Sequence, residues 1–176
     1  MDTSLFKSIG KDVVIGRNAV IRKPENVEIG NHVIIDVLSY INVTVKCKIG
    51  DHIHIGPYAS IIGREFEAEP FTVVSTGARM MCSSDEFHGN GIPGSTLPLE
   101  LRAVYGNKIM MKRCSCVCTN AVVLPDVTLA EGSVVSAGSI LAEDTEPWTI
   151  YGGIPALPLK KRKKDFILEK IKELGY

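Results

Sequence analysis

Four histidines are the residues of this sequence best suited to moving a proton near neutral pH. An imidazole changes its charge in that range, so a well-placed histidine can act as a general base. His88 lies in the acidic segment 85–88, and His54 follows His52 by two positions. His32 and His52 are expected to face solvent and are given no role. For His88 and His54, a solvated side chain without a role stays the alternative.

A run of five cations, Lys160 to Lys164, is the second feature with an evident chemistry. Such a cluster can pair with the phosphates of a ligand. It can equally be the solvated start of a helix. The sequence alone leaves both interpretations open.

The five cysteines are expected to be reduced thiols. Cys114, Cys116 and Cys118 alternate, and neighbours two apart on a strand do not usually form a disulfide with each other. A metal site in this segment would lack the usual two-residue gaps and a second pair of ligands. We therefore expect no bound metal.

Composition limits the fold that must position these groups. The 176 residues include 20 Lys and Arg against 20 Asp and Glu, and 45% are hydrophobic. This excludes a disordered chain, a collagen and a small disulfide-rich protein, and the zero net charge disfavours nucleic-acid binding. Val and Ile total 36 residues against 12 Leu, which favours β-structure.

A six-residue repeat runs along most of the chain. Aliphatic residues recur at every sixth position in the series Met111, Val117, Val123, Leu129, Val135 and Leu141. A small or β-branched residue lies four positions after most of them: Ser115, Ala121, Val127, Ser133 and Ser139. Earlier blocks repeat the pattern, with Ile15, Ile21, Ile29, Ile35, Ile41, Ile49, Ile55 and Ile61, and more weakly with Ala68, Val74 and Met80.

This period matches neither an amphipathic helix nor a simple alternating strand. It fits short strands joined by tight turns, with one aliphatic side chain per side pointing into a triangular prism. Three sides make one coil of about 18 residues, and stacked coils share a continuous core. The repeat therefore predicts an all-β parallel β-helix.

Two segments depart from the repeat. Residues 81–108 carry no hexad pattern and are rich in Gly and Pro, which predicts one long excursion loop of functional importance. Residues 160–176 begin with the basic run and continue with Ile167, Ile171 and Leu174 at helical spacing, followed by Gly175. We expect a β-helical domain over residues 1–159 and a basic segment with a C-terminal α-helix over residues 160–176.

These hexads resemble the hexapeptide-repeat acyltransferases, whose fold is a left-handed parallel β-helix. The resemblance covers roughly residues 15–162. Its most specific parts are the closing hexads, residues 123–141, and the exit segment Pro147 to Ala156. The chain looks most like the sugar O- and N-acetyltransferases of the galactoside and xenobiotic type. The resemblance implies transfer of an acetyl group from acetyl-CoA to a sugar or nucleotide-linked aminosugar, in the synthesis of surface polysaccharide or lipopolysaccharide.

The resemblance also implies roles for individual residues. Related enzymes carry a catalytic histidine on an equivalent loop, so His88 becomes the first candidate for general base, with Asp85 or Glu86 orienting its ring or holding substrate. The loop is also similar to a subgroup that reads Ser-Asp-Asp-Phe, whose members often lack a histidine at this position. His54 ends the hexad 49–54 and is expected at a corner of the prism. It is the rival base, because its neighbourhood in related enzymes faces the acceptor across a subunit boundary.

Contacts to the acetyl-CoA cosubstrate follow from the same resemblance. They are expected at Thr119, Ala137, Ala142, Ile154, Lys160 and Lys161. Relatives often have Lys or Arg after the Pro-Ala pair, where this chain has Leu157, so the phosphate contacts are expected at Lys160 and Lys161. The family further implies a homotrimer with active sites between neighbours.

The sequence also predicts a location for the protein and leaves two alternative functions open. No signal peptide is visible and no apolar run is long enough to span a membrane, so the chain is expected in the cytoplasm. One alternative function is a β-helix that serves as an assembly module without turnover. The other is a metalloenzyme like the γ-class carbonic anhydrases, for which His52-x-His54 has the wrong gap.

Overall fold

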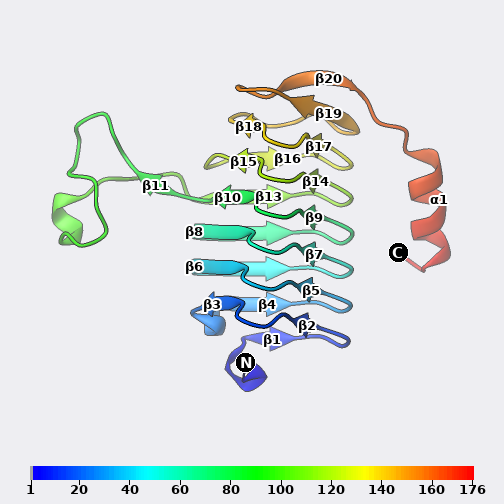
Figure 1. Ribbon diagram of the computed structural model, residues 1–176, viewed down its shortest axis with the longest axis horizontal. Coiled ribbons are helices and arrows are strands. Elements are labelled where there is room, and N and C mark those ends of the chain that lie inside the picture. Colours follow the sequence, from blue (N-terminus) through cyan, green and yellow to red (C-terminus); the bar gives the residue numbers. More distant parts are fainter. Residues whose placement is uncertain (1) are drawn as a thin grey trace.

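The chain forms a column of stacked coils, which Figure 1 shows from the side. The structure, a computed structural model, describes residues 2–176. Met1, the first residue of the predicted β-helical domain, lies outside the described residues. Successive coils pair through parallel strands, and the antiparallel pairs are β11 with β12 and β19 with β20. The parallel β-helix predicted from the hexads is confirmed.

Each full coil contributes to three faces. The first face is an 8-stranded sheet of β2 (Val14–Ile15), β5 (Ile34–Ile35), β7 (His54–Ile55), β9 (Val73–Val74), β14 (Cys116–Val117), β17 (Val134–Val135), β19 (Thr149–Gly152) and β20 (Leu157–Lys161). A 10-stranded sheet makes the other two faces by bending within β6 (Tyr40–Ile49) and β8 (Ser60–Ala68).

The second face contains the N-terminal halves of β6 and β8 together with β3 (Val20–Arg22), β10 (Arg79–Met81), β15 (Val122–Val123) and β18 (Ile140–Leu141). The third face contains their C-terminal halves together with β1 (Ser8–Ile9), β4 (Val27–Ile29), β13 (Lys108–Met111) and β16 (Thr128–Leu129). Short 3₁₀ helices lie at η1 (Thr3–Leu5), η2 (Pro24–Asn26) and η3 (Leu99–Leu101).

The core consists of columns of aliphatic side chains, one column behind each face. On the first face the column runs through Ile35, Ile55, Val74, Val117 and Val135, each at most 1% exposed. The small residues four positions later are buried at the corners, among them Ser115, Ala121 and Ser139. Both positions of the predicted hexad therefore point inward, as the sequence pattern predicts.

The corner between the third and first faces repeats one backbone conformation on every coil. Its residues have φ between 51° and 67°, the left-handed region that lets the chain turn sharply: Asp12, His32, His52, Phe71, Cys114, Gly132 and Trp148. The side chains stack along this edge. The rings of His32 and His52 are 4.7 Å apart, and those of His52 and Phe71 are 5.0 Å apart, between centroids.

Helix α1 (Asp165–Glu173) packs along this corner, at the right of Figure 1. Ile171 is buried against Cys114 and Trp148. Leu174, expected on the apolar face, is 60% exposed because the helix ends at Glu173, and Leu168 packs instead. The C-terminal helix itself is confirmed.

Two features of this corner depart from the expectations. Tyr176 turns back onto the stack, its ring edge-on to His52 with centroids 5.2 Å apart, and its hydroxyl donates to Asp51 Oδ2 at 3.1 Å. His52 is therefore half-buried, not solvent-facing as its hexad position suggests. Strand β20 also runs to Lys161, so the first two lysines of the basic run belong to the last strand.

The excursion loop leaves the second face after β10 and returns to the third face at β13. It extends away from the coils, at the left of Figure 1. Its stem is a short antiparallel pair, β11 (Ser84–Asp85) with β12 (Val104–Tyr105). Strand β8 pairs directly with β13, so the stack of coils continues as if the loop were absent.

All five cysteines are free thiols. Within residues 2–176, none of the helices has the length and apolar character that a membrane crossing requires.

Replacing Ile61 by Ala should destabilise the fold by about 2–5 kcal/mol, because Ile61 is fully buried between Ile41 and Met80 of the adjacent coils. Chemical denaturation would measure the change in the free energy of unfolding. Val45, which is 49% exposed, supplies the control: Val45→Ala should stay within about 0.5 kcal/mol. Equal losses in both variants would contradict the buried-column model.

Candidate active site

Asp85 fixes the stem of the excursion loop. Its carboxylate accepts a hydrogen bond from Arg102 Nη2 at 2.7 Å and another from the Gly94 backbone N–H at 2.8 Å. These bonds, the Arg102 bond above all, hold the pKa of Asp85 below its ordinary value. The carboxylate is therefore ionised at neutral pH and ties three distant parts of the loop together.

Glu86 shapes the turn that presents His88. Its two carboxylate oxygens accept the backbone N–H groups of His88 at 2.6 Å and Asn90 at 3.1 Å. Neither Asp85 nor Glu86 bonds to the His88 imidazole, so within one chain the expected orientation of the ring by these carboxylates is not present. His88 is exposed, and so is its neighbour Phe87, at 73%.

The loop borders two hollows. One, of about 120 Å³, is lined by Asp85, Glu86, Phe87, His88 and Tyr105. Ligand pockets usually measure roughly 300–1,000 Å³, so this hollow alone is too small to enclose a sugar nucleotide. A groove of about 390 Å³ lies next to it, between the loop and the coils, and Asp85 borders it as well.

His54 lies elsewhere, on strand β7 of the first face. The sequence places it at a corner of the prism, but in the structure the turn falls at His52 and His54 projects from the strand. Its Nε2 is 3.4 Å from Asp36 Oδ2 of the coil below, and this contact helps the Val37 backbone N–H to lower the pKa of Asp36. His54 thus has an orienting carboxylate, which His88 lacks, but it is remote from the loop of its own chain (Figure 1).

The predicted cosubstrate contacts divide into three groups. Thr119 and Ala137 lie on successive coils along the corner between the first and second faces, where Gly138 N–H bonds to Thr119 O at 2.9 Å. Ile154, 71% exposed, follows on the next coil along the same edge. Ala142 directly follows β18, across the second face from this edge. Lys160 and Lys161 pair with the opposite end of β19.

The basic run is only partly available to a ligand. Lys161 Nζ forms an ion pair with Glu146 at 2.8 Å and bonds to Thr149 Oγ1 at 2.8 Å. Arg162 is structural: Nη1 donates to Cys114 O and Gly132 O, and its guanidinium lies 5.7 Å from the centre of the Trp148 ring. Lys163 and Lys164 line a hollow of about 480 Å³ beside Trp148.

A thiol pair lies next to the predicted cosubstrate edge. The Cys116 thiol donates to Cys118, and this hydrogen bond lowers the pKa of Cys118 to about 7. Cys118 immediately precedes Thr119.

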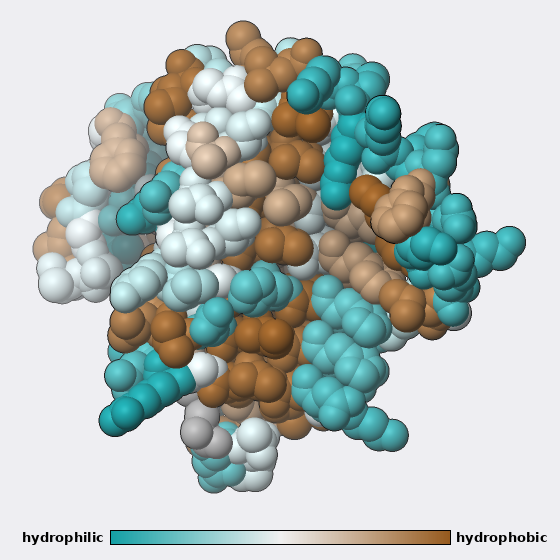
Figure 2. All heavy atoms as spheres, turned by 45° about the vertical axis from the view of Figure 1, so that its right-hand side comes forward, coloured by the Kyte–Doolittle hydropathy of each residue, from teal (hydrophilic) through white to brown (hydrophobic). Residues whose placement is uncertain are grey.

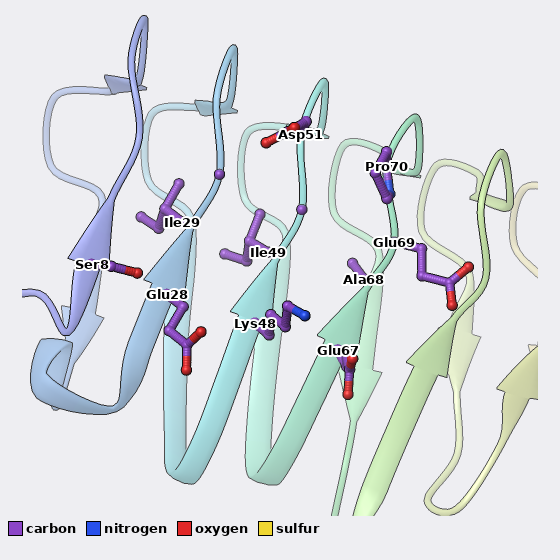
Figure 3. Close-up of a pocket in the computed structure, with 12 residues that line it drawn as sticks. Ser8, Glu28, Ile29, Lys48, Ile49, Asp51, Glu67, Ala68, Glu69 and Pro70 are labelled. Carbon is purple, nitrogen blue, oxygen red and sulfur yellow. The ribbon is translucent and has the colours of Figure 1, made fainter. Parts of the chain in front are cut away.

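The third face carries a groove of about 330 Å³ but none of the predicted site residues. Figure 3 shows Glu28, Lys48 and Glu67 side by side on three successive coils. Lys7 pairs with Glu28 at 2.7 Å and Lys108 with Glu67 at 2.8 Å, so the acidic groups are largely neutralised. This face is a charge-compensated surface.

The first face is different in character. Figure 2 shows apolar side chains gathered over it, next to a more hydrophilic edge. Val14 and Ile34 are 56% and 44% exposed on its lower coils, and Tyr58 is 63% exposed at the adjoining corner. Interfaces are depleted of charge at their centres, so this face and corner are better suited to contact with another copy than the third face is.

The sequence analysis did not identify several residues that contact the loop or His54. Arg102 and Arg64 belong to no repeat, and their partners Asp85 and Asn107 are 17 and 43 positions away. The Asp36 partner of His54 comes from the preceding coil, 18 positions earlier. The hexad spacing could have predicted this last pair. Within residues 2–176, no group of three or more His, Cys, Asp or Glu is arranged to hold a metal ion.

Comparison with known proteins supplies the family. No family model matches the sequence. The dTDP-4-amino-4,6-dideoxy-D-glucose acyltransferase of Escherichia coli is 31% identical over 164 residues, which cover 92% of this chain and 85% of that protein.

Solved structures agree with this relative. AntD, an N-acyltransferase from Bacillus cereus solved with dTDP and 3-hydroxybutyryl-CoA, superimposes with a TM-score of 0.90 at 29% identity and covers 98% of this chain and 92% of that one. A hexapeptide-repeat acetyltransferase from Vibrio cholerae bound to acetyl-CoA has a TM-score of 0.61 at 22% identity, over 92% and 74% of the two chains, and shares the fold. The chain therefore belongs to the hexapeptide-repeat acyltransferases and is a coenzyme A-dependent acyltransferase, as the resemblance of its hexads and exit segment to that family implies.

Proposed function

We propose that this enzyme transfers an acyl group from acyl-CoA to the amino group of a dTDP-linked 4-amino-4,6-dideoxy sugar. The observation that carries the proposal is the end-to-end likeness to two enzymes of this kind, one in sequence and one in fold. A variant of AntD has been solved with dTDP-4-amino-4,6-dideoxyglucose and coenzyme A together. The proposal therefore favours N-acylation over O-acylation. The choice between acetyl-CoA and donors with longer acyl chains is left to experiment.

The reaction forms a C–N bond and breaks a C–S bond. The sugar amine, once it has lost a proton, attacks the thioester carbonyl, and a backbone N–H of the coils holds the developing oxyanion. The intermediate then collapses and the coenzyme A thiolate leaves. The ionised Asp85 is suited to hold the amine while it is still an ammonium ion, and His88 or His54 is suited to take its proton.

The active site in this proposal is shared between copies. The loop hollow of one chain is too small for the acceptor, and the exposed Phe87 and Leu99 of the loop have no cover within residues 2–176. The apolar first face of a second copy supplies that cover, and it carries His54 with its partner Asp36. A trimer of parallel columns brings the loop of each copy to the face of the next.

AntD offers one further support. Its substituted forms include changes at a serine and at an aspartate ten positions apart. This chain has a serine and an aspartate with the same spacing, Ser75 on the first-face side of its coil and Asp85 on the loop. Within one chain the two lie on different parts of the coil, so a shared site between copies is the arrangement that could use both.

Coenzyme A is proposed to lie along the corner edge at Thr119, Ala137 and Ile154, where exposed backbone can pair with its pantetheine arm. Its phosphates are proposed to reach Lys160, Lys163 and Lys164, which form no ion pair within residues 2–176. Lys163 and Lys164 line the hollow beside Trp148. Ala142 and Lys161 are the weaker members of the predicted set, because Ala142 lies across the second face from this edge and Lys161 is ion-paired.

The assembly module without turnover, which the sequence left open, is set aside because the chain belongs to a family of acyltransferases. An ordered loop tied down by Asp85 and Glu86 is unnecessary for assembly alone.

Incubation of the enzyme with acetyl-CoA and dTDP-4-amino-4,6-dideoxyglucose should release free coenzyme A, which a thiol reagent detects. The product should be an amide, identified by mass spectrometry. The 4-hydroxy sugar nucleotide is the matched control and should release no thiol. Absence of thiol release with acetyl-CoA and with 3-hydroxybutyryl-CoA would reject the proposed function.

The two candidate bases, His88 and His54, predict opposite effects of alanine substitution on kcat. If His88 is the base, His88→Ala should lower kcat by roughly a hundredfold or more and His54→Ala much less. The reverse order would assign the base to His54. Both variants should keep the melting temperature of the parent because both side chains are exposed. Full activity in both variants would show that neither histidine is the base.

Light scattering should give a trimer at micromolar concentration. Replacing the exposed Ile34 of the first face by Lys should dissociate it, since a buried unpaired charge is costly. Lys48→Glu on the charged third face is the control and should remain trimeric. A parent protein that is monomeric and active would contradict the shared-site model.

A further inference from the structure

We propose that the groove at the base of the excursion loop binds the diphosphate of the nucleotide-linked acceptor, with Arg64 as its cation. The inference rests on the proposed function and adds to it a specific anion subsite. The groove measures about 390 Å³ and lies between the loop and the second-to-third corner of the coils. That volume is within the range of ligand-binding sites.

The groove exists because the corner is opened by irregular backbone. The pairing of β6 with β8 shifts register between Val43 and Lys46. Gly63 has φ of +132°, and a Cβ atom there would collide with the Ser83 backbone. Only glycine therefore allows the corner and the root of the loop to approach each other with this shape.

Arg64 presents a fixed guanidinium at this corner. Its Nε donates to Asn107 Oδ1 at 2.9 Å, which anchors the planar group. Its two terminal nitrogens have no partner within residues 2–176, and the side chain is exposed. A guanidinium held in this way offers a ready fork of N–H donors, and phosphate oxygens match that fork.

The two carboxylates that share the partner Asn107 with Arg64 are bonded to other groups. Asn107 accepts from Arg64 with its Oδ1 and donates with its Nδ2 to Glu65 Oε1 at 3.4 Å. The amide thus stands between the two charged groups. Asp126 is occupied by the backbone N–H groups of Asn107 and Lys108. The charge of Arg64 remains available to a ligand.

The other cation of the groove is already paired. Arg102 binds Asp85 at 2.7 Å, with both side chains largely covered. The uncharged polar groups of the lining are the hydroxyls of Thr44, Ser83, Ser84 and Ser95 and the amide of Asn42, and its apolar side chains are Ile62, Leu99 and Val104. The hydroxyls and the one unpaired guanidinium are groups that bind phosphate oxygens.

The position of the groove agrees with the order of groups in a sugar nucleotide. Asp85 borders both the groove and the smaller hollow that contains His88. A diphosphate at Arg64 therefore has its sugar directed toward Asp85 and His88. The reacting amine and the anion subsite are adjacent, as the covalent structure of the acceptor requires.

Isothermal titration with dTDP, in the absence of acyl-CoA, tests the subsite. Arg64→Gln should weaken dTDP binding roughly 10- to 100-fold, and Arg64→Lys, which keeps the charge without the fork, should fall in between. Coenzyme A binding should be unchanged in both variants. Lys172→Gln on the exposed side of α1 is the charge-matched control and should bind dTDP like the parent.

Kinetics give the second readout. Arg64→Gln should raise KM for the dTDP-aminosugar by a similar factor with kcat within about twofold, because uniform binding is lost and the chemical step is not. Parent-like dTDP affinity and KM in Arg64→Gln, with the parent enzyme active, would overturn the subsite and leave the proposed function intact. A parent enzyme that neither binds dTDP nor acylates the aminosugar would instead overturn the proposed function.

Discussion

The alignment of each coil with its neighbours is the constraint on which the structure depends. The backbone of a coil bonds almost entirely to the coils above and below, and inward residues such as Ile35, Ile55 and Val74 must stack directly. A slip by one residue would turn every inward side chain outward. Variation is therefore confined to the corners, the outer surface and the ends of the column, and all the candidate chemistry lies there.

The excursion loop shows how function is added without disturbing this alignment. It begins and ends on the same coil, between the second and third faces, so β10 and β13 on either side of it both still pair with β8 of the neighbouring coil. Because the coils supply no structure to the loop itself, the loop is held by its own polar contacts, chiefly those of Asp85 and Glu86. The loop is thus stabilised by an ion pair and backbone hydrogen bonds, whereas the column of coils is stabilised by aliphatic packing.

The distribution of surface character points to a site built from more than one copy. The third face balances its charges, whereas the first face exposes aliphatic side chains beside His54. The His88 ring has no hydrogen-bond partner within residues 2–176. His54 has Asp36 as a partner, but it lies far from the excursion loop of the same chain. In the proposed trimer, these two incomplete halves on opposite sides of one chain would form a single site between neighbouring copies.

The six-residue period was enough to predict the fold, because it records which side chains face inward, and burial imposes the same choice on every coil. It also located the excursion loop and the C-terminal helix as departures from that period. It could not place Arg64 beside Asn107 or show that Arg162 binds corner carbonyls, because such contacts join residues that share no repeat. The sequence predicted His54 at a corner, whereas it lies on strand β7. It predicted phosphate contacts at Lys160 and Lys161, but Lys161 forms an ion pair with Glu146. Only the tertiary structure decided these points, since side-chain partners depend on distances between coils that periodicity does not encode.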